Sequence, residues 1–408
     1  MSSSSRWPVV AAFAALGVST QVCWLTYTAI TTATAQHFGV DEQAVGWLAN
    51  LFPLLFVALA VPTGLALDRW QRPTLAVGAL LIAVGAAIRL VDDAYWAALV
   101  GQTLAAVAQP ILANAITRIA ATYLDPADRP LGIAVGAGAT YLGMIAATAI
   151  GTVAGDVRTV VAIGTGISVV TAIAALLALR VRPPHRHDGT ALPTVREVWR
   201  LPGVPVLSGI VFLGMGIFVA LATWLEPLLA PAGLTADTTG LLLLVMLVAG
   251  VVGSIIVPPL AVRRGWEFGA LRLTGVVTAL ACLLLGFLPL ATGFVASVPI
   301  GFMLLSALPV ALAWVERDDS PAAGPITSLI WMTGNAGGVV VSFVAGYLLP
   351  APALAFTLFA ALGLGAAWLG TRLQRDQEQV AGADGHDQLA QRGDPAIGQE
   401  PAPGTSPA

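Results

Sequence analysis

The 408-residue sequence contains no lysine, only two cysteines and few charged residues. Charged residues make up 10% of the chain, whereas soluble domains carry roughly 25%. Both Cys23 and Cys282 lie inside apolar stretches, so they are interpreted as small core residues rather than as a disulfide or a metal-ligand pair. With 57% apolar residues and a net charge of −3, the composition excludes an ordinary soluble domain, gives no sign of nucleic-acid binding and indicates a membrane protein.

Catalytic signatures are also missing. All four histidines (37, 185, 187 and 386) fall in expected loops or in the C-terminal tail. The sequence shows no phosphate-binding glycine-rich loop, no nucleophile–histidine–acid set and no cluster of metal ligands. We therefore expect neither an enzyme nor a protein with a cofactor or a metal. The short polar start, Met1–Trp7, does not fit a cleavable signal peptide, so the first apolar span is expected to remain in the protein.

Long apolar runs dominate what is present. A membrane-spanning helix needs about 20 mainly apolar residues. Twelve segments qualify: 8–35, 44–67, 74–91, 95–123, 130–154, 157–180, 204–230, 237–261, 268–290, 293–315, 322–349 and 352–373. The longest polar interruption follows the sixth span. It divides the chain into an N-terminal bundle (1–181), a linker (182–203) with a surface turn near 195–200, a C-terminal bundle (204–374) and a disordered tail (375–408).

Arginine placement predicts the orientation. If the N-terminus, the even-numbered loops and the tail are cytoplasmic, seventeen of the nineteen arginines lie inside. Only Arg89 and Arg158 then lie outside. Because positive charge marks cytoplasmic loops, we expect a multi-pass protein of the plasma (inner) membrane with both termini in the cytoplasm.

Polar and aromatic residues inside the spans mark a candidate interior surface. In the first span, Gln21, Trp24 and Thr28 follow the i, i+3, i+7 spacing of one helical face. For each such residue, helix–helix hydrogen bonding is the alternative to ligand contact. An aromatic face in a cavity poor in charge suits a cationic group, which makes Trp24 the strongest candidate. The full set of substrate-binding candidates is Gln21, Trp24, Tyr27, Gln109, Tyr141, Phe218, Trp224, Trp331 and Asn335.

One carboxylate, Glu226, stands within the seventh span. Ionisable groups inside a membrane are functional candidates by default. Glu226 could bind a cation, carry a coupling proton or pair with an arginine at the outer gate. Alternatively, it lies at the extracellular end of the span and is simply hydrated. The sequence leaves both open.

The ten residues between the second and third spans, GLALDRWQRP (64–73), carry a recognisable motif. They resemble the signature loop of the major facilitator superfamily, G-x-x-x-D-R-x-G-R-[KR], and keep Gly64, Asp68, Arg69 and Arg72. The corresponding loop of the second half, PPLAVRRGWE (258–267), keeps tandem arginines. Asp68 could accept from helix N-termini or from an arginine of the facing half, which would make the loop a cytoplasmic latch. A plain basic turn is the alternative. The gate candidates are Gly64, Asp68, Arg69, Arg72, Arg118, Arg263 and Arg264.

The resemblance implies an all-α polytopic membrane protein with the major facilitator fold, in which 12 transmembrane helices form two pseudo-symmetric six-helix bundles. It further implies a substrate site between the bundles near the midplane and rocker-switch alternating access.

A closer resemblance is to the feline leukaemia virus receptor-related (FLVCR-like) branch. It rests on QVCWLTYTAITT (21–32), VGQTLAAVAQPILANAITRIAATYL (100–124) and the seventh and eighth spans. Animal members move choline and ethanolamine, and the tryptophan that faces the choline ammonium corresponds to Trp24. The resemblance places the aromatic partner at Val219, with Phe218 or Trp224 as substitutes. Cavity glutamines of the branch fall at Tyr141 and Asn335, and Glu226 stands where a neutral residue is expected.

The leading hypothesis is a secondary active or facilitative transporter of a small cationic or zwitterionic organic solute. An organic-anion or cyanate-type carrier is the first alternative and needs an arginine at the cavity, for which Arg118 is a better candidate than Arg89 or Arg272. A proton-coupled efflux pump is the second, although Leu99 stands where the superfamily often has a coupling arginine. A membrane sensor is the third. Expected partners are the substrate, membrane lipid and, in a coupled carrier, a proton or another ion; we expect a monomer.

Overall fold

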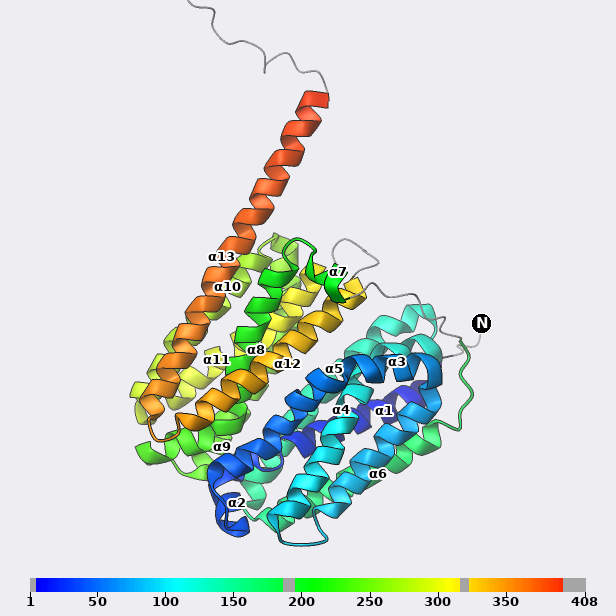
Figure 1. The fold of residues 1–408 in the computed structure, drawn as a ribbon, viewed down its shortest axis with the longest axis vertical. Helices are drawn as coiled ribbons and strands as arrows, with labels where there is room; N and C mark the ends of the chain where they lie inside the picture. Colours follow the sequence, from blue (N-terminus) through cyan, green and yellow to red (C-terminus); the bar gives the residue numbers. More distant parts are fainter. Residues whose placement is uncertain (1–4, 186–194, 316–322, 392–408) are drawn as a thin grey trace, which may run out of the picture.

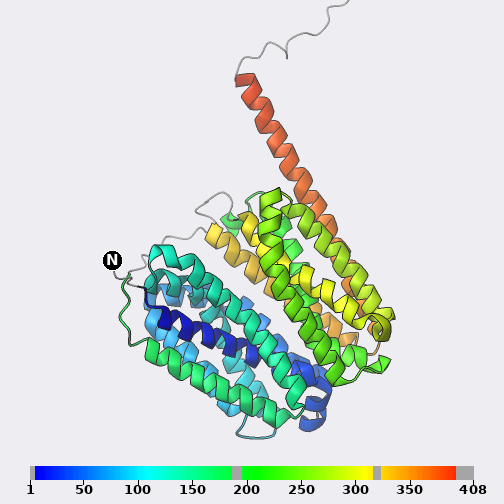
Figure 2. The same ribbon diagram turned by 180° about the vertical axis from the view of Figure 1, so that it is seen from behind.

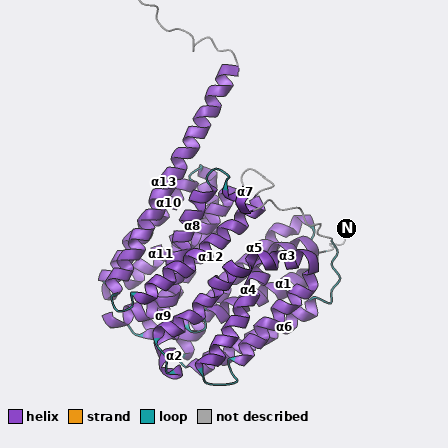
Figure 3. Ribbon diagram, in the orientation of Figure 1, coloured by secondary structure: helices purple, strands orange, loops and turns teal. Residues whose placement is uncertain are grey.

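The computed structural model describes residues 5–185, 195–315 and 323–391. Throughout these ranges the secondary structure is helical, with turns between the helices (Figure 3). The helices are α1 (Trp7–Trp24), α2 (Thr31–Phe38), α3 (Glu42–Ile88), α4 (Tyr95–Tyr123), α5 (Arg129–Ala154), α6 (Val157–Ala178), α7 (Val195–Trp199), α8 (Val204–Leu229), α9 (Ala236–Arg264), α10 (Glu267–Phe287), α11 (Pro289–Val315), α12 (Ala323–Tyr347) and α13 (Pro352–Gln391), with 3₁₀ turns η1 (Thr28–Ile30), η2 (Pro126–Asp128) and η3 (Ala230–Ala232).

The helices form two bundles that lie side by side, α1–α6 in the N-terminal half and α8–α13 in the C-terminal half (Figures 1 and 2). Helix α3 packs against α12, and α5 packs against α9, where the halves meet. The short helices α2 and α7 lie at opposite ends of the paired bundles (Figure 1). We call these the α2 end and the α7 end. The start of α1 lies toward the α7 end (Figure 1). The loops that follow odd-numbered spans, which we expect outside the cell, therefore lie at the α2 end.

The second and third spans are joined in one kinked helix. Eleven helical segments of the described chain are long and apolar enough to cross a membrane, and one of them is the 47-residue α3. A straight helix of that length would extend about 70 Å, roughly twice what a bilayer core requires. Trp70 breaks it with non-helical angles (φ −137°, ψ 55°). Pro73 explains the position, because it cannot donate a hydrogen bond to the carbonyl of Arg69. The segment 64–73 is thus a helical kink rather than the expected loop.

The first span, expected to be continuous, is interrupted. Helix α1 ends at Trp24, the η1 turn follows at Thr28–Ile30, and α2 begins at Thr31. The interruption is rich in β-branched residues, which lose side-chain freedom in a helix. Their hydroxyls also bond back to the main chain: Thr28 Oγ1 donates to the Leu25 carbonyl at 3.1 Å. Such local bonds compete with regular helical ones.

The linker and the C-terminal segment complete the chain. The surface turn expected near 195–200 is present as α7. The tail expected to be disordered from residue 375 instead continues α13 as far as Gln391. Gln, Glu, Leu and Ala are good helix formers, and extending an existing helix needs no new nucleation. The remaining part of that expected tail, 392–408, lies outside the described residues.

Candidate functional site

Two aromatic side chains meet at the interface between the halves, Trp24 at the end of α1 and Phe218 in α8. Their ring centroids lie 6.4 Å apart in an edge-to-face arrangement, and both side chains are buried. The indole N–H of Trp24 donates to the Ala49 carbonyl of α3 at 3.1 Å. Helix α3 therefore fixes the orientation of Trp24 within its own half, while the ring contacts the opposite half.

Three further candidates carry amide side chains. The Gln21 amide donates to Thr20 Oγ1 at 3.4 Å, and the Asn335 amide donates to the Trp331 carbonyl at 2.9 Å. The Gln109 Oε1 atom is buried and has no hydrogen-bond partner among the described residues.

Tyr141 and Trp331 lie where the halves face each other. The Tyr141 hydroxyl interacts with Ser254 of α9. The Trp331 ring lies 6.5 Å from that of Phe56 on α3 and remains 38% exposed. Each of these contacts joins an N-terminal helix to a C-terminal one, so both depend on the relative position of the halves.

At the α2 end, Trp224 of α8 seals the interface. Its side chain is 2% exposed, and its indole N–H donates to the Ser342 carbonyl of α12 at 2.8 Å. The ring packs on Gly46 of α3, where a Cβ atom would lie only 1.8 Å from the ring. Gly46 is the residue that permits this close approach. Trp224 thus acts as a plug between the halves rather than as a partner of Trp24.

Glu226, two residues further on, is buried at the same end. The Thr32 backbone N–H donates to Glu226 Oε2 at 2.9 Å. Thr32 lies in the first turn of α2, whose N–H groups have no partner within the helix and carry partial positive charge. The Thr32 hydroxyl in turn donates to Glu42 Oε1 at 2.7 Å. The structure therefore places Glu226 in a contact between the halves and not in open water.

A second polar contact supports the closure of this end. The Gln43 amide of α3 donates to the Gly346 carbonyl of α12 at 3.0 Å. Nearby, the rings of Trp47 and Phe343 pack at 5.6 Å. Together with the Trp224 plug and the Glu226 contact, these interactions hold the α2 end of the interface closed.

The motif residues at the α7 end make contacts within the N-terminal half. Asp68 forms an ion pair with Arg118 of α4. The Arg72 guanidinium donates to the Leu179 carbonyl, and that of Arg69 lies 4.9 Å from the centre of the Trp70 ring. Asp68 thus pairs with an arginine of its own half, whereas one expectation was an arginine of the facing half.

The remaining gate candidates do not join this cluster through any hydrogen bond or ion pair of the described residues. Arg263 and Arg264 occupy the last turn of α9. Gly64 faces the Asn114 amide, which a Cβ atom would approach to 3.7 Å. The structure brings Asp68 and Arg118 together and leaves these three apart.

Sequence reasoning missed Arg89. Placed outside by the arginine count, it is 5% exposed and lies inside the N-terminal bundle. Its Nη1 donates to Thr26 Oγ1 and to Gln102 Oε1, both at 3.0 Å, and its Nη2 donates to Cys23 Sγ at 3.3 Å. Its stem crosses α4 at Gly101, where a Cβ atom would lie 2.4 Å from Arg89 Cγ. The available sequence signal was Gln102, an amide in an apolar span that needs a partner.

Tyr27 belongs to the surroundings of Arg89 rather than to those of Phe218. It is buried near the Arg89 guanidinium, and its hydroxyl makes no hydrogen bond to the described residues. Its ring packs on Phe38 of α2 at 6.1 Å. Tyr27 therefore faces the interior of its own half.

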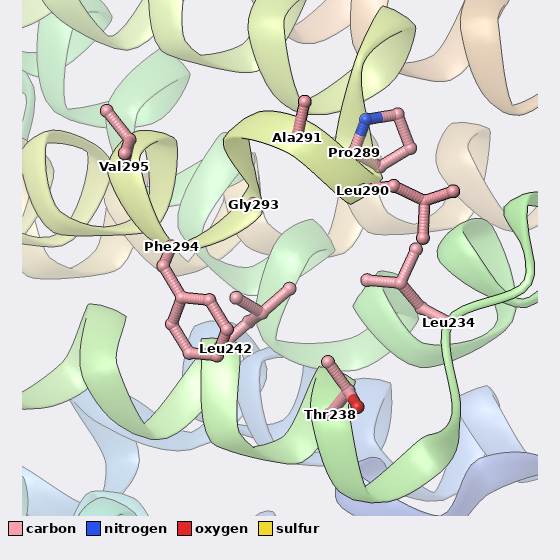
Figure 4. A pocket seen from close by; sticks show the side chains of 9 residues that line it. All are labelled: Leu234, Thr238, Leu242, Pro289, Leu290, Ala291, Gly293, Phe294 and Val295. Atoms are coloured by element: carbon pink, nitrogen blue, oxygen red, sulfur yellow. The ribbon is translucent and has the colours of Figure 1, made fainter.

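A separate hollow lies between the start of α9 and the start of α11 (Figure 4). It is lined mainly by aliphatic side chains and the Phe294 ring, and the Thr238 hydroxyl is the polar side-chain group among the lining residues. Since none of the candidate residues lines it, this hollow does not belong to the site around Trp24 and Phe218.

Comparison with known proteins agrees with this architecture. Residues 10–342 match the family model of the Major Facilitator Superfamily. A bacterial homologue of the human lysosomal transporter Spinster, solved in an inward-facing and occupied conformation, superimposes with a TM-score of 0.73 at 14% identity. The match covers 92% of this chain and 98% of that one. At this identity the likeness concerns the fold alone, and it confirms the predicted fold class.

Relatives by sequence include FLVCR proteins. An uncharacterised MFS-type transporter of Caenorhabditis elegans, C09D4.1, is 23% identical over 385 residues, which cover 84% of this chain and 64% of the relative. The choline/ethanolamine transporter FLVCR1 of Felis catus is 27% identical over 130 residues, or 31% of this chain and 23% of that protein. The chain thus spans less than two thirds of either relative. Its family match and its fold show that it is a multi-pass membrane protein belonging to the major facilitator superfamily of transporters, with relatives in the FLVCR-like branch.

Proposed function

We propose that this transporter moves a small organic cation or zwitterion of the choline or ethanolamine type by rocker-switch alternating access. The observation that carries the proposal is the pairing of Trp24 and Phe218 across the two halves. An ammonium group is attracted to an aromatic face within about 6 Å of the ring centroid. In the present state the rings contact each other directly, so a cation would bind between them when the halves move apart at this level.

The charges near the interface favour a cation over an anion. An organic-anion carrier needs a free arginine at its cavity, and Arg118 is already paired with Asp68. Arg89 is buried within its own half and donates to neutral groups. The partial match to a choline/ethanolamine transporter supports the same substrate class. The anion carrier remains the alternative.

We place the α7 end in the cytoplasm and the protein in the plasma (inner) membrane, because seventeen of nineteen arginines then lie inside. The closed α2 end is then the outer gate, plugged by Trp224 against Gly46. The Asp68–Arg118 pair then lies at the inner end, where it joins α3 to α4 within the N-terminal half. Opening of the outer gate separates Glu226 from Thr32.

Glu226 is proposed as the coupling group. Its carboxylate bridges the halves through the N-terminus of α2, so neutralising it weakens the contact that opening must break. A proton or another cation would have that effect. In the efflux alternative, the same step would couple export to the entry of protons down their gradient.

The test is thermal unfolding of the purified protein with choline, ethanolamine and organic anions. A ligand at a hundred times its Kd adds about 2.7 kcal/mol to the unfolding free energy. We expect stabilisation by the two amines, a much smaller stabilisation in Trp24→Ala and Phe218→Leu, and an unchanged one in Trp96→Ala. Trp96 is the matched control, since it is 52% exposed and bonded to Asp92 at the α2 end.

Flux into proteoliposomes then measures transport of whichever amine stabilises. Stabilisation by anions alone, unchanged in Trp24→Ala, would contradict the proposal and favour the anion carrier.

A further inference from the structure

We infer that Arg89 is a positioning residue, which fixes the break in the first span and thereby holds Trp24 at the substrate site. The inference rests on the proposed function of Trp24. It assigns a role to a side chain that does not itself touch the interface between the halves.

Arg89 binds both sides of Trp24 along the chain. Its Nη2 donates to Cys23 Sγ at 3.3 Å, and its Nη1 donates to Thr26 Oγ1 at 3.0 Å. Cys23 precedes Trp24, and Thr26 lies beyond the end of α1. One guanidinium therefore joins the last helical turn to the irregular segment that follows it.

Gln102 completes this attachment. Its Oε1 accepts from Arg89, and its Nε2 donates to the Cys23 carbonyl at 3.0 Å. In a continuous helix that carbonyl would accept from the backbone N–H four residues on, at Tyr27. Since α1 ends at Trp24, the carbonyl needs another donor. Gln102 supplies it, and Arg89 orients Gln102.

Burying the Arg89 guanidinium is energetically unfavourable, which indicates that its positive charge has a role. No carboxylate of the described residues lies within ion-pairing distance of Arg89, and its Nε atom has no hydrogen-bond partner among them. A buried charge without a counter-charge is strongly unfavourable in a membrane protein. Apolar side chains could fill the space. A guanidinium adds several N–H donors in a rigid fork, which matches the thiol, hydroxyl and amide acceptors that surround it.

The consequence reaches Trp24 through the backbone. The indole N–H is held by α3 through the Ala49 carbonyl, whereas the Cα of Trp24 is held by the segment that Arg89 fixes. Together the two attachments define the direction in which the ring faces Phe218. Without Arg89, the indole keeps its hydrogen bond but the backbone that carries it is free to shift.

The binding experiment measures the Kd of choline in a double-mutant cycle. Arg89→Lys keeps the charge but loses the fork, and Thr26→Val removes one acceptor at nearly constant volume. Each should raise the Kd about tenfold, because a displaced indole loses most of its cation–π contact with the ammonium group. Arg158→Met is the control, because Arg158 is an exposed arginine at the same end, paired with Asp93. It should leave the Kd unchanged.

The cycle separates positioning from general structural support. In a Trp24→Ala background, the residual Kd should be the same with Arg89 and with Lys at that position, because Arg89 acts through Trp24. If Arg89→Lys weakened choline binding tenfold both with Trp24 and with alanine at that position, the inference would be wrong.

A second readout does not depend on the substrate. Cys23 is fully buried, and in a Cys282→Ser chain it is the sole cysteine. Its alkylation by N-ethylmaleimide should be slow in the parent and several-fold faster in Arg89→Lys and Thr26→Val, but not in Arg158→Met. An unchanged alkylation rate in both Arg89→Lys and Thr26→Val would show that Arg89 does not fix the segment that follows α1. Faster alkylation in a protein that binds no choline would refute the proposed substrate and leave the role of Arg89 standing.

Discussion

Replacing Gly46 by alanine should open the interface between the halves at the α2 end, the proposed outer gate. In the closed arrangement a Cβ at this position would lie 1.8 Å from Cη2 of Trp224, 2.3 Å from Cζ2 and 2.5 Å from Cζ3. The indole cannot swing away freely, because it is buried and its N–H is bonded to Ser342. The added methyl group therefore acts only on the state in which α3 and α8 meet at this end.

The size of the effect follows from the overlap. The 1.8 Å separation falls about 1.6 Å short of an ordinary van der Waals contact at 3.4 Å. Overpacking of this kind costs about 1–3 kcal/mol. Because only the closed state bears this cost, the ratio of open to closed states should rise by roughly 5- to 150-fold, at about 1.4 kcal/mol for each factor of ten.

The assay is thiol labelling at Asn50. This residue is 3% exposed and lines a small space beside Trp224 and Phe343. A cysteine there (Asn50→Cys) should be protected while the α2 end is closed and react with an impermeant maleimide when it opens. Both natural cysteines are fully buried, so the parent protein gives the baseline. Labelling should accelerate by the factor given above when Gly46→Ala is added.

Two comparisons make this prediction refutable. Gly166→Ala is the matched control, since a Cβ atom at Gly166 meets nothing within 4 Å. Trp224→Phe should suppress the effect of Gly46→Ala. The atoms that clash, Cη2, Cζ2 and Cζ3, belong to the outer ring of the indole, and the shorter phenylalanine side chain does not reach as far. Folded Gly46→Ala protein that labels at the parental rate would refute the plug.

Two further predictions concern charged groups. Glu226→Gln keeps an acceptor for the Thr32 N–H but removes the charge, so the contact should weaken by about 1 kcal/mol. Labelling at Asn50→Cys, compared at one pH, should then rise about fivefold; an unchanged rate would argue against the Glu226–Thr32 contact as part of the closed interface. Asp68→Asn removes an ion pair whose partners are partly exposed, so the unfolding free energy should fall by less than about 1 kcal/mol. Flux should nevertheless fall, and unchanged flux would argue against a role of this pair in the transport cycle.

Most of the fold could be predicted because its signal is local. Runs of about 20 apolar residues locate each crossing, and a single polar interruption separates the halves. The kink at Trp70 was harder to predict, since the sequence shows Pro73 but does not show whether a turn or a bent helix results. The break after Trp24 was missed for a similar reason. A run of threonines weakens a helix, yet its neighbours decide whether the helix continues.

The site was predictable only where a residue type is informative by itself. Trp24 stood out because a tryptophan on a polar face suits a cation, and Phe218 was named as a substitute partner. Arg89 was assigned by its position at the end of a span. Its side chain turns inward past Gly101 to Gln102 of α4, whereas arginines near helix ends usually keep the charged head in water. Gly46 carried no signal, because its importance comes from a tryptophan distant in sequence.

The broken first span links the proposed site to the proposed gate. Its first part, which ends at Trp24, is attached to the N-terminal half by Arg89 and by the Ala49 carbonyl. Its second part begins at α2 and touches the C-terminal half through Thr32 and Glu226. A continuous helix would transmit any pull on Thr32 directly to Trp24. An irregular segment fixed on one side can absorb that displacement, so the indole stays with its own half while the gate contact breaks. One rotation of the halves then separates both pairs, Trp24 from Phe218 and Thr32 from Glu226. A ligand bound between the rings can therefore shift the gate toward its open state without touching it.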